Sequence, residues 1–275
     1  MNDPPHPFDR ATALDPTGKN SWTGVTSEDY WAFVGPFGGV LSALLLRSVL
    51  EHPDRLGRPL ALTVNFCAPL AKGAFGVSAR PVRTNRSSQH WSVTLTQGAD
   101  IVLTATVVTA LRPETWSHQP RKAPQAPQPD GIEPYRMAPG GSSWIGRYEF
   151  RFASGAPRIG RADMAAGAPL SPYSLLWLRD EPPRPLDYLS LAAMADAFFG
   201  RIFHALGRLT PFGTVSLTTY FLADEDEIAR QGRAAILGVA DASRFHRAYG
   251  DQAVEMWGRD GTLLATSTQV AYFRA

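Results

Sequence analysis

Three segments of this chain occur twice in the same order, and this internal repeat limits the possible folds more than any other feature. Within the aligned segments Arg47 matches Arg201, Thr63 matches Thr218 and Thr106 matches Thr268. The three pairs of segments are GGVLSALLLRSVLEH at 38–52 with AAMADAFFGRIFHAL at 192–206, ALTVNF at 61–66 with SLTTYF at 216–221, and VLTATVVTALR at 102–112 with LATSTQVAYFR at 264–274. Because matching segments in a constant order are typical of a repeated structural unit, the sequence predicts two similar halves.

A stretch rich in proline and glycine separates the two halves. It reads PETWSHQPRKAPQAPQPDGIEPYRMAPGGS and follows neither a helical nor a strand period, as a linker would. The predicted division is therefore an N-terminal unit at 1–112, a linker at 113–142 and a C-terminal unit at 143–275.

Each half is expected to contain one long apolar helix followed by several strands. The strand segments are rich in β-branched and aromatic residues, and turn residues lie between them. Two hairpins are predicted, with turns at 98–100 (GAD) and 258–261 (GRDG). A helix packed on an antiparallel sheet, present twice, is an α+β architecture.

Composition narrows the functional classes. The net charge of the 275 residues is +2, and no long basic block or basic amphipathic helix is present, so a nucleic acid or a membrane surface is not the expected partner. The single cysteine, Cys67, excludes an intramolecular disulfide, and its place in the strand-like run LALTVNFCAPL predicts a core or lining residue. The N-terminus has no apolar signal core, and the expected location is the cytoplasm.

A carboxylate interrupts the second apolar helix pattern. Asp196 lies within YLSLAAMADAFFGRIFHALG, where an isolated charge costs several kcal/mol unless it is paired, hydrogen-bonded or protonated. Its match in the first half is Ser42, and Gln269 likewise matches Val107 on an apolar strand face. Two polar replacements in one unit, on a helix and a strand expected to pack together, indicate a polar pocket. The glycine pair Gly38-Gly39 at the start of the first helix would leave backbone N–H groups open to a ligand.

The stretches GPFGGVLSALLLR at 35–47, LSLAAMADAFF at 189–199 and GTLLATSTQVAYFRA at 261–275 resemble the double-hotdog acyl-CoA thioesterases, the TesB-like or acyl-CoA thioesterase II group. The resemblance implies a double hotdog of two tandem units, each a long helix wrapped by an antiparallel β-sheet. It also implies hydrolysis of acyl-CoA without a cofactor. The family's water-holding Asp, Thr and Gln would fall on Asp196, Thr214 and Gln269. Alignment of Thr214 is the least fixed, because a one-residue gap would substitute Val215.

Other interpretations remain open at this stage. Asp196 could be a first-turn acid satisfied by the dipole of its own helix, Gln269 a backbone bridge, and Thr214 an ordinary strand hydroxyl. The pair Gly38-Gly39 could serve only close packing of the helix on the sheet. The chain could be a non-catalytic acyl or acyl-CoA binding protein. A hotdog hydratase is disfavoured, since the fifth residue after Asp196 is Arg201 and not histidine.

His204 is expected in the core or lining, and the arginine-rich turns at 83–88 and 244–249 are candidate CoA contacts. No metal-ligand spacing, P-loop or dinucleotide motif is present. Homodimerisation, sheet edge to sheet edge, is compatible with the fold.

Overall fold

The computed structural model describes residues 4–136, 142–159 and 170–274. The helices are α1 Pro7–Ala11, α2 Gly38–Leu50, α3 Tyr188–Met194, α4 Arg201–Leu206 and α5 Glu225–Ala229, with short 3₁₀ turns at Glu28–Tyr30, Pro129–Gly131 and Ser143–Arg147. The strands are β1 Asp15–Gly18, β2 Ser21–Val25, β3 Arg58–Phe66, β4 Ala74–Thr84, β5 Ser88–Gln97, β6 Asp100–Ala110, β7 Tyr148–Ser154, β8 Ser174–Asp180, β9 Phe212–Phe221, β10 Ile236–Asp241, β11 Phe245–His246, β12 Tyr249–Trp257 and β13 Leu263–Phe273.

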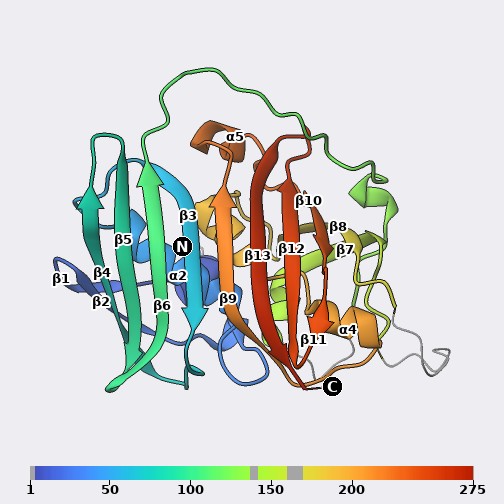
Figure 1. Ribbon diagram of the computed structural model, residues 1–275, viewed down its shortest axis with the longest axis horizontal. Coiled ribbons are helices and arrows are strands. Elements are labelled where there is room, and N and C mark those ends of the chain that lie inside the picture. The colour runs from blue at the N-terminus through green and yellow to red at the C-terminus, as the bar shows by residue number, and fades with distance from the viewer. Residues whose placement is uncertain (1–3, 137–141, 160–169, 275) are drawn as a thin grey trace.

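One continuous antiparallel sheet spans both halves of the chain (Figure 1). Its strand order is β1-β2-β4-β5-β6-β3-β9-β13-β12-β10-β8-β7, with β11 attached to β12. Both predicted hairpins, β5–β6 and β12–β13, are confirmed. The two halves meet where β3 pairs with β9, so the antiparallel α+β prediction is confirmed, while the sheets of the two halves form one layer.

Strand registers match on the two sides of the β3–β9 junction. Thr63 lies opposite Thr218, and their hydroxyl oxygens are 3.0 Å apart. On the first side Leu62 lies opposite Val107, and on the second side Leu217 lies opposite Gln269. Val107 and Gln269 therefore occupy the same place in the two half-sheets, as the sequence alignment predicts.

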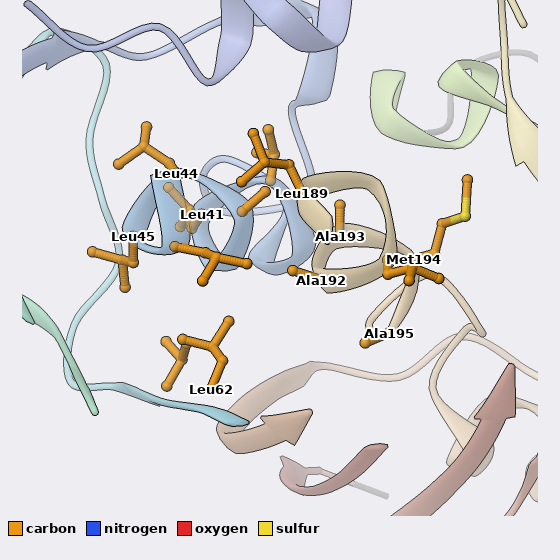
Figure 2. Close-up of a cluster of buried hydrophobic side chains, with 14 of the residues drawn as sticks. Leu41, Leu44, Leu45, Leu62, Leu189, Ala192, Ala193, Met194 and Ala195 are labelled. Carbon is orange, nitrogen blue, oxygen red and sulfur yellow. The ribbon is translucent and has the colours of Figure 1, made fainter. Parts of the chain in front are cut away.

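Helices α2 and α3 pack against each other and cover one face of the sheet. Figure 2 shows the leucines of α2 above Leu62 of β3, with the alanines of α3 beside them. Small side chains let the two helices approach closely: a Cβ on Gly39 would overlap the carbonyl of Ala193 and the ring of Phe37. Among the described residues, no helix combines the length and apolar character that crossing a membrane requires.

The prediction of one long helix in each half is wrong for the second half. Helix α2 is continuous over thirteen residues, but the corresponding segment is divided into α3 and α4, and residues 195–200 lie between them. The cause is tertiary. The Ser267 hydroxyl donates to the Ala195 carbonyl at 3.3 Å, and Phe199 adopts a left-handed backbone with φ of 54°.

The predicted linker runs without a long regular element over one edge of the sheet, from β6 to the far half (Figure 1). It is fastened to the second half, because the Gln119 amide donates to the Gly261 carbonyl at 2.9 Å and the Trp177 indole donates to the Pro127 carbonyl at 2.8 Å. Residues 137–141 of the predicted linker lie outside the described residues.

Candidate active site

Asp196 lies in the gap between α3 and α4, not within a helix as the sequence indicates. From this gap its carboxylate lies beside the start of α2. The Gly39 N–H donates a hydrogen bond to the carboxylate, and so does the Thr214 hydroxyl. A Cβ on Gly38 would lie only 2.6 Å from Asp196 Oδ2, so a side chain there would collide with the carboxylate.

The first turn of α2 is suited to a negative charge. Helix N-termini carry N–H groups without intrahelical acceptors and the positive end of the helix dipole. Phe37 caps α2 without a side-chain hydrogen bond, and no acidic residue occupies the first turn. Asp196 supplies the missing acceptor from the other half of the chain. The alternative that Asp196 is stabilised by the dipole of its own helix is wrong, because Asp196 lies outside α3 and α4 and its backbone partner is Gly39 of α2.

A β-bulge sets the direction of Thr214. Ser216 lies opposite Val270 and Thr214 opposite Ala271, so Val215 has no partner on β13. If β9 continued without a bulge, regular alternation would point Val215 toward the helices and Thr214 toward solvent. The bulge reverses the alternation and turns Thr214 inward, as bulges near functional sites commonly do. This is the residue at which the sequence alignment was least fixed.

Gln269 completes the polar group from the neighbouring strand. Its side chain is 5% exposed, and Thr214 Oγ1 lies 3.0 Å from Gln269 Oε1. Asp196, Thr214 and Gln269 thus meet at one point between the helix gap and the sheet. All five residues predicted for the site, Gly38 and Gly39 included, come together there.

Burial raises the pKa of Asp196 to about 7. The hydrogen bonds from the Gly39 N–H and the Thr214 hydroxyl act in the opposite direction, because they stabilise the ionised form. A carboxyl group with a pKa near neutrality can accept a proton and release it again in the same pH range.

A cavity of about 330 Å³ opens onto this polar group. Asp196, Thr214 and Gln269 lie on its wall, and most other lining side chains are apolar. Two of these, Phe37 and Trp144, are stacked with ring centroids 4.2 Å apart. The aromatic and aliphatic part of the wall includes Phe37, Phe66, Leu103, Trp144, Phe199 and Phe203. The cavity is suited to an apolar group carrying a reactive centre at one end.

The sequence analysis missed Arg201 and Gln252, which lie behind the polar group. Arg201 is 2% exposed and donates twice to the Phe199 carbonyl, which stabilises the left-handed turn beside Asp196. The signal that identified Asp196, a charge within an apolar run, is also present at Arg201.

Other predicted residues lie outside the polar group. His204 is buried, and desolvation and the nearby Arg201 lower its pKa to about 3, which makes it a neutral core residue. Cys67 lines the cavity and is exposed, as the lining prediction requires. The turns at 83–88 and 244–249 contribute no described residue to the cavity wall. Within the described chain, no three His, Cys, Asp or Glu side chains are grouped closely enough to hold a metal ion.

Family models match nearly the whole chain. Residues 27–110 match the acyl-CoA thioesterase N-terminal domain, and residues 118–273 match the acyl-CoA thioesterase C-terminal domain. A comparison with curated proteins gives no match.

Solved structures agree with this fold. A hotdog-fold protein of unknown function from Alicyclobacillus acidocaldarius is 43% identical, with a TM-score of 0.91 over 98% of this chain and 99% of that one. The acyl-CoA thioesterase II TesB2 of Mycobacterium marinum is 17% identical, with a TM-score of 0.73 over 97% and 96% of the two chains. The dehydratase domain of RzxB from Pseudomonas fluorescens is 12% identical, with a TM-score of 0.57 over 98% and 100%. Since thioesterase and dehydratase share the fold, only the site can separate these two reactions.

Proposed function

The chain belongs to the acyl-CoA thioesterase family, and from this premise we propose that it hydrolyses the thioester bond of an acyl-CoA by base-assisted attack of water. The observation that carries the proposal is the meeting of Asp196, Thr214 and Gln269 at the polar end of an otherwise apolar cavity. The apolar wall suits the acyl chain, and the polar end suits the reacting carbonyl and a water molecule.

In the proposed reaction the three side chains hold the attacking water. Asp196 takes a proton from this water as its oxygen bonds to the acyl carbon, and Thr214 and Gln269 fix its orientation. The tetrahedral intermediate then collapses, and its C–S bond breaks. The CoA sulfur leaves with the bonding electrons and takes the proton back from Asp196. The products are a carboxylic acid and free CoA, and the side chains return to their starting state.

Negative charge develops on the carbonyl oxygen in this step and needs donors. The backbone N–H groups at the start of α2 are the proposed donors, because Gly38 and Gly39 carry no side chain that would block the approach of the thioester. In the free protein the Gly39 N–H donates to Asp196. Binding of the thioester would therefore redistribute these hydrogen bonds between the carboxylate and the substrate oxygen.

We further propose that the fold is a double hotdog of two tandem units, at 1–112 and 143–275, joined by the linker at 113–142. The matching registers on either side of Thr63 and Thr218 support this division. Its second unit would carry the catalytic side chains, and its first unit would supply the helix N-terminus that faces them.

The site favours hydrolysis over hydration of a double bond. A hydratase that handles two protons requires a second acid or base beside the aspartate. His204 is the closest histidine in sequence, but it is neutral, buried and absent from the described cavity wall. The partners of Asp196 are a hydroxyl, an amide and a backbone N–H, which can orient a water molecule but cannot supply a second proton-transfer group.

The test is CoA release from a panel of acyl-CoAs of different chain length, with wild type beside Asp196→Asn. Cys67 is exposed and lies on the cavity wall, so it would react with a thiol-detecting reagent. Cys67→Ser should therefore be the background for such assays, or loss of the thioester should be followed directly. We expect Asp196→Asn to reduce kcat by about 10²–10⁴-fold.

Two results would contradict this proposal. Equal release by wild type and Asp196→Asn would remove Asp196 from the mechanism. Saturable binding of acyl-CoA without release at any chain length would assign the chain to the non-catalytic binding proteins.

A further inference from the structure

A buried cationic side chain lies directly behind the proposed catalytic group. Arg201 belongs to the second half, at the first turn of α4, and no carboxylate of the described chain forms an ion pair with it. Neutral oxygens satisfy its guanidinium instead. They are the carbonyl oxygens of Phe199 and Pro172, the hydroxyl of Ser174 at 2.7 Å and Oε1 of Gln252 at 3.1 Å. Asp241 acts on Arg201 only from beyond ion-pair distance, so the hydrogen bonds of this cation fix the direction of each neutral group that accepts them.

The Gln252 amide is oriented by this cation. Its oxygen accepts from Arg201 Nε, so its NH₂ group points the other way, and there it is buried without a hydrogen-bond partner. A buried amide donor without an acceptor costs about 1–3 kcal/mol, which calls for a partner nearby.

The nearest candidate acceptor belongs to Gln269. Gln252 and Gln269 lie opposite each other on β12 and β13, and both side chains are buried. Residues opposite each other in an antiparallel pair have Cβ atoms about 5 Å apart on the same face. Both also line one small cavity of about 10 Å³. The two amide groups are therefore within reach of each other.

The Thr214 hydroxyl has one proton and two acceptors around it. Its oxygen is 3.0 Å from Gln269 Oε1, and it also donates toward the Asp196 carboxylate. One proton cannot serve both. Turning the Gln269 amide by half a rotation resolves both conflicts. Its NH₂ group then donates to Thr214 Oγ1, its oxygen accepts from Gln252 Nε2, and the Thr214 proton is left for Asp196.

We propose that Arg201 and Gln252 are positioning residues that set the direction of the Gln269 amide, and through it commit the Thr214 proton to Asp196. The donors follow one direction along this relay: Arg201 to Gln252, Gln252 to Gln269, Gln269 to Thr214, and Thr214 to Asp196. The relay rests on the proposed thioester hydrolysis for its effect on rate, but its effect on the Asp196 carboxyl exists without substrate.

Breaking the relay should change the pKa of the Asp196 carboxyl in a defined direction. Loss of the Thr214 hydrogen bond raises the pKa of the carboxyl, because that bond stabilises the ionised form. The Gly39 N–H from α2 and Tyr148 from β7 also interact with Asp196, and His204 from α4 interacts with Arg201. Burial raises the pKa of Tyr148 well above its ordinary value and lowers that of His204, so both are neutral near pH 7.

Gln252→Glu tests the relay without removing volume. A glutamate still accepts from Arg201, but it cannot donate to Gln269, so the Gln269 amide would turn its NH₂ group toward residue 252 and its oxygen toward Thr214. We expect kcat to fall about tenfold with KM nearly unchanged, and the acid limb of the pH–rate profile to move upward by about one pH unit. Gln252→Met carries no charge and should move the same limb in the same direction.

Gln231→Glu is the matched control. Gln231 is also a buried amide, but its hydrogen bonds go to Asp260, Arg259 and Glu227, away from the cavity wall. This variant should change the melting temperature without moving the pH profile. If the acid limb of the pH–rate profile moves in Gln252→Glu but stays at the wild-type pH in Gln252→Met, the cause is the added charge, and the relay is wrong. The relay is also wrong if kcat falls in these variants while the acid limb stays at the wild-type pH.

A carboxyl-carbon NMR titration separates this proposal from the catalytic one. The Asp196 resonance is identified by its loss in Asp196→Asn, and it is followed in wild type, Gln252→Glu and Gln252→Met without substrate. An upward movement of its midpoint in both variants supports the relay, even where wild type hydrolyses no acyl-CoA and the proposed function falls. Equal midpoints in all three proteins overturn the relay, whatever the activity.

Discussion

The two halves of this molecule have matching strand registers, but they place different side chains at the corresponding positions. In the first half, Val107 is fully buried and the Ser42 hydroxyl donates to the Gly38 carbonyl at 2.9 Å within an unbroken α2. In the second half the corresponding positions are Gln269 and Asp196, and the helix is divided between α3 and α4. Both halves line the cavity, and the second half supplies the side chains of its polar group.

This difference shows how a polar cavity can be tolerated in a small protein. A divided helix, a left-handed Phe199 and a partly buried carboxylate each cost stability. The first half contributes a leucine cluster (Figure 2). It also contributes α2, whose N-terminus faces the carboxylate. The stable half therefore supports the site directly, in addition to completing the sheet.

The largest effect on activity is expected from replacing Asp196, the acid that distinguishes the second half from the first. Asp196→Asn keeps the shape of the side chain and abolishes its basicity, so kcat should fall by about 10²–10⁴-fold. Steady-state hydrolysis of the best acyl-CoA of the panel measures this. Ser42→Ala, at the corresponding place in the first half, should leave kcat within about twofold, because Ser42 serves only helix α2. A comparable loss in both variants would mean that the halves do not divide the work as described.

Two threonines on β9, Thr214 and Thr218, allow the next test, which compares a hydroxyl at the site with one at the junction of the halves. Thr214→Val removes the hydroxyl that donates to Asp196, and we expect kcat to fall about 10–100-fold with little change in melting temperature. Thr218→Val is its matched control, because Thr218 pairs with Thr63 across the β3–β9 junction. An equal loss of kcat in Thr214→Val and Thr218→Val would contradict a specific role for the Thr214 hydroxyl.

The pH–rate profile tests the charge state of the cavity. A general base acts only when ionised, and burial raises the pKa of Asp196 to about 7. We expect kcat/KM to rise about tenfold per pH unit below this value and to level off above it. A flat profile between about pH 5 and about pH 8 would contradict an ionisable base of this pKa.

Ser42→Asp places a carboxylate in the first half, at the position that corresponds to Asp196. It tests how much a buried carboxylate lowers the free energy of unfolding where it lacks the donors that surround Asp196. Ser42 is fully buried, and an aspartate there could not donate to the Gly38 carbonyl. We expect Ser42→Asp to lower the free energy of unfolding by about 3 kcal/mol, against about 1 kcal/mol for Ser42→Ala. Chemical denaturation measures both. An aspartate tolerated without loss would show that the first half already contains donors for a carboxylate.

The smallest expected effect is on stability. The pKa of Asp196 is higher in the folded chain than in the unfolded chain, so the folded state binds the extra proton between about pH 4 and pH 7. Stability from this group is complete below that range and is lost as pH rises through it. Asp196→Asn should therefore melt a few degrees above wild type at about pH 8, and this advantage should vanish near about pH 4. Parallel melting curves at the two pH values would contradict a raised pKa.

The antiparallel α+β class and the two hairpins follow from local signals in the sequence, namely strand composition and turn residues. Asp196 is identified as a charge within an apolar run, Gln269 from the internal repeat, and Thr214 from the family resemblance alone. The division of the second helix, the bulge at Val215 and the position of Asp196 opposite α2 do not follow from the sequence, and the three-dimensional structure is needed to see them. Each of these depends on contacts between distant segments, Ser267 with Ala195, β9 with β13, and α2 with the gap after α3. Local periodicity carries no information on such contacts, since it describes which face of an element is apolar and not which partner interrupts it.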